Sequence, residues 1–220
     1  MRWSLDCSRA SRFGAALVLL TLAACGTAPT ETFYMLGPAL TSSRDGTAQQ
    51  AQATTGAVAA STAQSRALAI VVDPASVPEL VDRPQFVVST GDARVVLLEQ
   101  QRWAEPLRSQ ISRTVALDLT QLLPSARIST NPDILDGADE ALSFRIALDV
   151  QRFESRPGDS VAVEILWTLR RGPGDTLRSG REAVRESVIG AGYEGLVSGH
   201  NRALAAVSRA IAAAVRSAVP

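Results

Sequence analysis

The stretch ALSFRIALDVQRF, residues 141–153, decides the fold because apolar and polar residues alternate along most of it. A period of two is typical of a β-strand with one face buried and the other in water. VAVEILWTLRR, residues 161–171, repeats the pattern, and the more polar TLRSGREAVRESVIG, residues 176–190, follows it. Turn sequences RPGD (156–159) and GPGD (172–175) separate the three segments, which predicts an antiparallel meander. The residues expected on its buried face are Leu142, Phe144, Ile146, Leu148, Val150, Val161, Val163, Ile165, Trp167 and Leu169.

Two amphipathic helices are predicted to cover this meander. From Pro106 to Leu123 the apolar residues recur every three or four positions, and Pro124 ends the pattern. A second, alanine-rich helix is predicted from about Glu194 to Ala218. A half-buried sheet needs a cover, and these helices are the candidates for it. The predicted fold class is therefore α+β: a mostly antiparallel sheet with a three-stranded C-terminal meander, covered by two amphipathic helices.

The earlier part of the chain contains four further strand-like runs, at residues 32–38, 67–74, 84–90 and 94–100. Gly91-Asp92-Ala93 lies between the last two and predicts a hairpin. Residues 39–66 are rich in Ala, Thr, Ser and Gln and have almost no large apolar side chain, so we predict a disordered insertion there. We therefore expect one α+β domain over residues 32–220, interrupted by this insertion.

The N-terminus has the features of a secretory signal. Three arginines precede an apolar run at residues 13–24, which is shorter than the roughly 20 residues that a spanning helix needs. Leu22-Ala23-Ala24-Cys25 resembles the bacterial lipobox, although an ordinary signal that happens to contain a cysteine is the alternative. We predict that residues 1–24 are cleaved, that Cys25 carries a diacylglyceryl and an acyl lipid, and that residues 25–31 form a short tether. Gly26, where inner-membrane lipoproteins of enterobacteria have Asp, favours the outer membrane.

Composition excludes several functional classes. The whole chain has 22 basic and 22 acidic residues, and loss of a signal with three Arg and one Asp leaves a net charge of about −2, which does not suit nucleic-acid binding. Cys25 is the only cysteine after cleavage, so no disulfide or cysteine metal cluster is expected. The single histidine, His200, is expected at the surface or at a cap. No nucleophile-elbow, phosphate-loop or zinc-protease motif occurs, and we predict no catalytic residue, metal or non-lipid cofactor.

Residues 77–107, VPELVDRPQFVVSTGDARVVLLEQQRWAEPL, resemble the ABC-type transport auxiliary lipoproteins, the PqiC-like family. The likeness rests on the early aromatic strand, on the R-P-Q strand, on the R-W-A-E-P-L block at the first helix and on the closing helix. It covers residues 30–218 apart from the Ala/Thr-rich insertion.

Six residues in these segments are the candidates for partner contact: Arg83, Pro84, Gln85, Arg102, Trp103 and Glu105. Core packing is the better interpretation of Trp103, because a tryptophan before a helix can cover the edge of the core. Trp is also enriched at interface hot spots, which leaves the contact interpretation open. No structural role for Arg102 or Glu105 is evident from the sequence.

The resemblance implies a non-catalytic component of a system that moves lipids between two membranes. Its implied partners are a periplasmic MCE-domain protein and an inner-membrane ABC permease and ATPase. The protein would contact the membrane through its lipid anchor. Self-assembly into a homo-oligomeric ring is a further expectation. One alternative is a lipoprotein that docks or regulates another envelope machine, for cell-wall synthesis or lipopolysaccharide export. A second alternative is a lipid-binding carrier.

Overall fold

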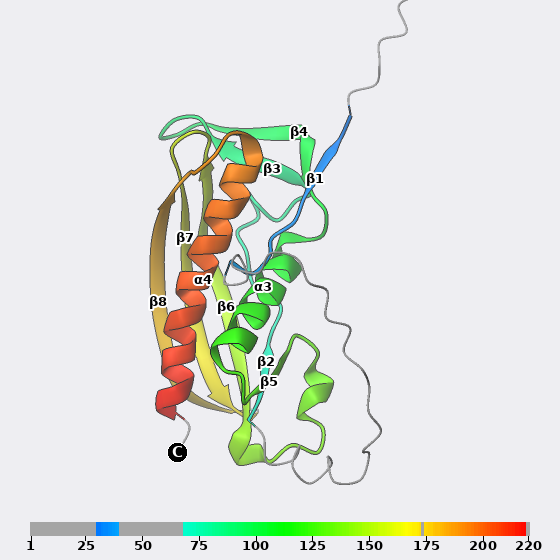
Figure 1. The fold of residues 1–220 in the computed structure, drawn as a ribbon, viewed down its shortest axis with the longest axis vertical. Helices are drawn as coiled ribbons and strands as arrows, with labels where there is room; N and C mark the ends of the chain where they lie inside the picture. The colour runs from blue at the N-terminus through cyan, green and yellow to red at the C-terminus, as the bar shows by residue number, and fades with distance from the viewer. Residues whose placement is uncertain (1–29, 40–67, 173, 219–220) are drawn as a thin grey trace, which may run out of the picture. The chain divides into compact units, whose positions relative to one another are not determined.

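The computed structural model describes residues 30–39, 68–172 and 174–218 (Figure 1). The predicted signal, Cys25 and nearly all of the predicted insertion lie outside the described residues. The described residues from Glu31 onward belong to one compact unit.

The C-terminal meander is confirmed. Strands β6 (Ser143–Arg156), β7 (Ser160–Arg171) and β8 (Asp175–Ser187) pair antiparallel along nearly their whole lengths. Gly158 and Gly172, in the two turns, have φ values of 73° and 54°, a left-handed conformation that glycine adopts without a steric cost. Of the residues predicted to be buried, only Leu142 is not, because it ends a short 3₁₀ helix, η2 (Glu140–Leu142), before the strand begins.

A β-bulge in β6 changes the side of the sheet on which its later residues lie. The register shifts between Val150 and Arg152, so Phe153 and Ser155 continue the buried face while Arg152 is exposed. Simple alternation from Val150 would have placed Arg152 in the core. The bulge therefore keeps the core apolar at this end of the strand.

The meander belongs to a five-stranded sheet with the order β5-β2-β6-β7-β8. Strand β2 (Ala69–Val72) lies parallel to both β6 and β5 (Arg127–Ser129), and all four of its residues are buried. A short continuous apolar run is typical of such an interior parallel strand. The sequence did not predict β5, whose three residues, Arg-Ile-Ser, are half-buried, nor the 3₁₀ helix η1 (Pro132–Leu135) after it.

A second sheet contains three strands in the order β1-β4-β3. Strands β3 (Gln85–Ser89) and β4 (Val95–Trp103) form the predicted hairpin, and β1 (Thr32–Tyr34) adds to the far side of β4 in parallel. The first strand is shorter than predicted, since residues 35–38 have no strand partner. The two sheets differ from the single, mostly antiparallel sheet of the prediction, although the α+β class is confirmed.

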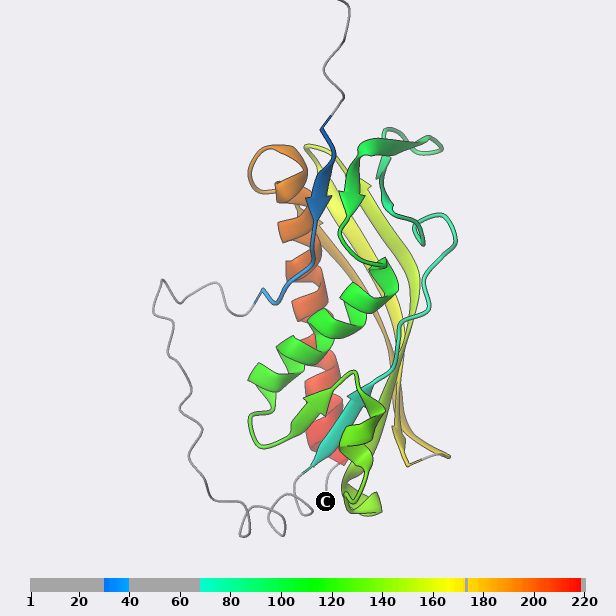
Figure 2. The ribbon, with the colours of Figure 1, turned by 90° about the vertical axis from the view of Figure 1, so that its right-hand side faces the viewer.

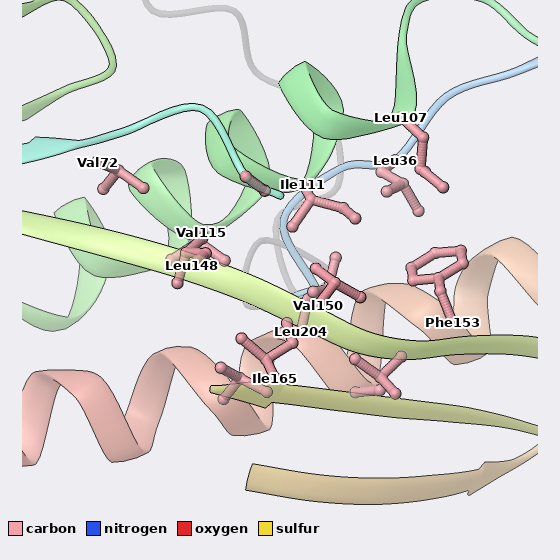
Figure 3. Close-up of a cluster of buried hydrophobic side chains, with 14 of the residues drawn as sticks. Leu36, Val72, Leu107, Ile111, Val115, Leu148, Val150, Phe153, Ile165 and Leu204 are labelled. Carbon is pink, nitrogen blue, oxygen red and sulfur yellow. The ribbon is translucent and has the colours of Figure 1, made fainter. Parts of the chain in front are cut away.

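Helices α3 (Leu107–Leu122) and α4 (Gly192–Ala218) lie on the same face of the five-stranded sheet (Figure 2). Helix α4 packs on β7 and β8, and α3 packs on β2, β5 and α4. Between helices and sheet lies the main core, in which Ile111, Ile165 and Leu204 are fully buried (Figure 3). Neither helix in the described part of the chain combines the length and apolar character that crossing a bilayer would require.

Candidate functional site

The two segments that carry the family resemblance meet at an irregularity in the β3–β4 hairpin. Gln85 pairs with Arg102, whereas the next residue, Phe86, pairs with Leu98, so three residues of β4 are left over between the two pairs. The amide of Trp103 donates a hydrogen bond of 2.7 Å to the carbonyl of Pro84. The sequence separates these segments by more than fifteen residues, and the hairpin places them side by side.

A groove of about 780 Å³ lies beside this junction. Five of the six predicted contact residues line it: Arg83, Pro84, Arg102, Trp103 and Glu105. The remaining lining comes from β1, from the residue before Arg83, from the link between β4 and α3 and from the first turn of α3, namely Phe33, Asp82, Ala104, Pro106, Arg108 and Ser109. Gln85 does not line the groove; its amide donates to the Glu99 carboxylate at 3.2 Å. We call this feature the β1–α3 groove.

Most of the charged groups in the β1–α3 groove are paired. Arg102 Nη1 lies 2.8 Å from Glu31 Oε1, and Arg108 forms an ion pair with Asp82. Glu105 Oε2 lies 2.7 Å from Arg113 Nη1 on the second turn of α3. The expectation that Arg102 and Glu105 lack a structural role is therefore wrong. Arg102 links β4 to the residue before β1, and Glu105 links the β4–α3 connection to the second turn of α3. These pairs are at least partly exposed, so each contributes little to stability.

Arg83 is the cation of the β1–α3 groove that lacks such a partner. Its Nη2 makes only a long hydrogen bond of 3.4 Å to the carbonyl of Glu79, and its buried Nε has no partner among the described residues. In the described part of the chain, no carboxylate lies within ion-pair distance of it. A guanidinium without a carboxylate partner is available to pair with an anionic group of a bound molecule.

An aromatic cluster packs against Trp103, one of the residues that line the groove. Trp103 is buried, with an exposed fraction of 5%, and stacks on Phe86 with ring centroids 4.5 Å apart. Tyr34 and Tyr193 meet the same Phe86 ring at 5.7 Å and 6.0 Å. The core-packing interpretation of Trp103 is confirmed, and only the edge of its side chain is left to the groove. The cluster joins β1, β3, β4 and the start of α4, so it holds the groove walls in fixed positions.

Gln110 positions the groove and was not singled out in the sequence. Its side chain is fully buried on α3; its Oε1 accepts from the amide of Leu36 at 2.7 Å, and its Nε2 donates to the carbonyl of Glu105 at 2.8 Å. It therefore ties the segment after β1 to the beginning of α3. Gln110 follows Leu107 by three positions and directly precedes Ile111, and this helical spacing is the sequence signal that could have placed it on the inward face.

His200 is not at the surface or at a cap, as the sequence suggested. It is completely buried on α4, stacks on Phe153 with centroids 3.8 Å apart, and shares a hydrogen bond of 2.8 Å between its Nε2 and Ser155 Oγ. Burial lowers the pKa of the His200 imidazole from its ordinary 6.5 to about 3. The flanking Gly199 and Asn201 suggested exposure, but Gly199 instead allows α4 to approach Val161 closely.

We expect this histidine to make the fold sensitive to acid. Because its pKa is 6.5 in a model peptide and about 3 in the folded protein, the unfolded chain binds a proton below pH 6.5 that the folded chain does not accept. This contribution to stability is complete above pH 6.5 and is lost toward pH 3, by about 1.4 kcal/mol per pH unit. Urea unfolding of the native protein and of His200→Gln at several pH values checks this; equal pH dependence in the two proteins would contradict it.

Comparison with known proteins places the chain in a family. A sequence model described as "ABC-type transport auxiliary lipoprotein component" matches residues 49–212, which is more than half of the 220 residues. The chain belongs to this family. The matched range contains the R-P-Q and R-W-A-E-P-L segments of this auxiliary lipoprotein and most of α4, whereas β1 and Cys25 precede it. No curated protein matches the chain in sequence.

Two solved structures have the same fold as this auxiliary lipoprotein. An uncharacterized protein is 19% identical with a TM-score of 0.63, over 84% of this chain and 99% of its own. A protein of Xanthomonas campestris assigned to family DUF330 is 16% identical with a TM-score of 0.52, over 70% of this chain and 90% of its own. At these identities the likeness shows the fold alone.

Proposed function

We propose that this protein is a non-catalytic lipoprotein of an intermembrane lipid transport system, anchored by Cys25 in the outer membrane and facing the periplasm. In this role it docks a periplasmic MCE-domain protein, which in turn connects to an inner-membrane ABC permease and ATPase. The family description supports the ABC-transport part of the proposal. The lipobox at Cys25 supports the anchor, and the β1–α3 groove is the proposed docking site.

The observation that carries the docking proposal is the convergence of the family-like segments on one groove with an unpaired cation. Arg83 lacks a carboxylate among the described residues, while the walls present Phe33, Pro84 and Pro106. Phe33 is 58% exposed, which is unusual for a large aromatic side chain. An extended partner segment with an acidic side chain beside apolar ones would complement this surface: its carboxylate would meet Arg83 and its apolar side chains would cover Phe33.

The experiment is affinity purification of the lipidated protein from its own envelope, with identification of the proteins that accompany it. We expect an MCE-domain protein together with its permease and ATPase. Recovery of a cell-wall synthase or of a lipopolysaccharide exporter instead would contradict the transport proposal. Purification without any protein partner, but with bound phospholipid, would favour a carrier.

The docking site is tested by reversing one charge. Arg83→Glu should reduce recovery of the MCE protein at least about tenfold, because like charges placed against each other at an interface cost several kcal/mol. Arg178→Glu is the matched control, since Arg178 is an exposed arginine on β8, outside the groove. Equal recovery with the native protein and with Arg83→Glu would remove the groove from the docking proposal.

A further inference from the structure

Several loops meet at one end of the domain. Figures 1 and 2 show the β3–β4 hairpin, the β6–β7 turn and the β8–α4 loop at the end where β1 begins. The amide of Val188 donates to the carbonyl of Asp159 at 2.9 Å, which joins the β8–α4 loop to the β6–β7 turn. We call residues 91–96, 156–160 and 188–192 the tip.

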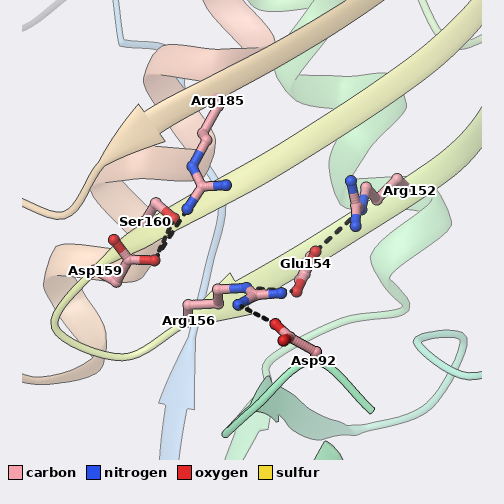
Figure 4. A network of polar contacts seen from close by, with 7 residues as sticks. All are labelled: Asp92, Arg152, Glu154, Arg156, Asp159, Ser160 and Arg185. Atoms are coloured by element: carbon pink, nitrogen blue, oxygen red, sulfur yellow. Dashed lines mark hydrogen bonds and ion pairs between the residues drawn. The ribbon is translucent and has the colours of Figure 1, made fainter. Parts of the chain in front are cut away.

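Polar contacts link the segments of the tip and the strands beside it (Figure 4). Arg156 reaches Asp92 of the hairpin at 3.5 Å and Glu154 at 2.8 Å, and Arg185 reaches Asp159 at 3.0 Å. Burial alone would raise the pKa of Glu154, but its hydrogen bond from Arg156 and the charge of Arg152 lower it overall. The carboxylate therefore stays ionised and holds Arg156, on the same strand, where its Nη1 reaches Asp92 of the hairpin.

Apolar side chains nevertheless project into solvent from this tip. Ile189 is 69% exposed, and Val95 and Val96 are 41% and 38% exposed. They come from the start of β4 and from the β8–α4 loop; this loop leads into Tyr193, whose ring lies 6.0 Å from that of Phe86 on β3, the strand that pairs with β4. Arg94, next to Val95, is exposed and has no ion-pair partner among the residues that the structure describes. Exposed apolar side chains beside a free arginine suit a membrane interface, because the apolar groups can enter the headgroup–acyl boundary while the cation meets anionic lipid.

The length of the chain before β1 agrees with this interpretation. Phe33 follows Cys25 by eight positions. A fully extended chain of eight residues spans at most about 26 Å. Strand β6 has 14 residues, which extend for about 45 Å, so the opposite end of the meander lies beyond the reach of the tether. The tether alone would let the domain lie on its side. The exposed apolar groups at the tip favour an upright arrangement instead.

We propose that the tip is a membrane-contact surface, at which Val95, Val96 and Ile189 enter the headgroup region of the bilayer that holds the lipid anchor and Arg94 meets lipid phosphate. The inference rests on the proposed anchor at Cys25 and does not depend on the identity of the partner. Contact can be intrinsically weak and still persist, because a short tether keeps the tip at a millimolar effective concentration at the surface. None of the tip residues lines the β1–α3 groove, so the docking site stays open.

The test uses single cysteines in the lipidated, full-length protein. Lipidation consumes the thiol of Cys25 and cleavage removes Cys7, so an introduced cysteine is the only free thiol. Val96→Cys and Ile189→Cys probe the tip, while Leu117→Cys on α3 and Leu166→Cys on β7 are controls at similarly exposed leucines. Each variant is labelled with a fluorophore and reconstituted into phosphatidylethanolamine–phosphatidylglycerol vesicles that contain a lipid with a nitroxide in its headgroup region.

We expect the labels at positions 96 and 189 to be quenched several-fold more strongly than those at 117 and 166. Equal quenching at all four positions, or none at the tip, in protein that sediments with the vesicles would overturn the proposed contact surface and leave the anchor intact. Such a result would also favour a protein partner for the tip. Protein that remains in the supernatant would overturn the anchor and this inference together.

Discussion

Cys25→Ser should release the protein from the membrane fraction. Serine offers no thiolate for the thioether to diacylglycerol, so the variant cannot carry the acyl chains proposed for Cys25. Two or three acyl chains bind a bilayer stably, since each buried methylene contributes about 0.8 kcal/mol, so their loss should shift nearly all of the protein to the soluble fraction. Ultracentrifugation of cell envelopes, followed by immunodetection, measures the distribution.

The chain offers a matched control for this experiment in its other cysteine. Cys7 lies in the predicted signal, before the apolar run, so Cys7→Ser should leave the protein in the membrane pellet. If Cys25→Ser sediments as the native protein does, even after a carbonate wash, the lipid anchor is refuted. A tip that contacts lipid only weakly would not survive that wash without the anchor.

Phe86→Ala should lower the free energy of unfolding by about 3–5 kcal/mol, the usual cost of truncating a buried phenylalanine. Phe86 is fully buried and its ring meets Trp103, Tyr34 and Tyr193, which belong to three different segments. The substitution therefore leaves a cavity at the place where β1, β4 and α4 come together. Because domains of this size are stable by about 5–15 kcal/mol in total, a large share of the stability would be lost. Guanidinium unfolding monitored by circular dichroism gives the value.

Phe33→Ala is the corresponding control, with the same chemical change at an exposed position on β1, in the same three-stranded sheet. Phe33 is 58% exposed and lines the groove, so its loss should change stability by no more than about 0.5 kcal/mol. It should, however, weaken recovery of the partner, because the aromatic surface proposed for docking is removed. Equal destabilisation by the two substitutions would show that the aromatic cluster does not hold this part of the fold together.

The meander and the helices could be predicted because their patterns are local. A period of two over a dozen residues, as in residues 161–171, needs no knowledge of the partner strand. Strand β5 was missed because its three residues carry no such pattern, and only pairing with β2 makes them a strand. The same holds for β1, whose length is set by its contact with β4 rather than by the apolar run at 32–38.

The candidate site was predicted in its residues but not in its geometry. The R-P-Q and R-W-A-E-P-L segments identified Arg83 and Arg102 by resemblance, whereas the shift in the β3–β4 register determines which side chains share a groove. That shift removes Gln85 from the groove and places Trp103 mostly in the core. A bulge depends on how two strands fit together, so neither strand alone reveals it.

The sequence by itself determined the α+β class, the order of its long elements and the lipobox at Cys25, because periodicity and short motifs are properties of neighbouring residues. Only the tertiary structure decided which polar groups are buried. The sequence suggested a surface position for His200 and did not single out Gln110. Each is fully enclosed, with Ser155 and Phe153 around the histidine and with Leu36 and Glu105 bound to the glutamine. Burial and pairing depend on elements distant in sequence, and therefore they appear only when those elements are packed together.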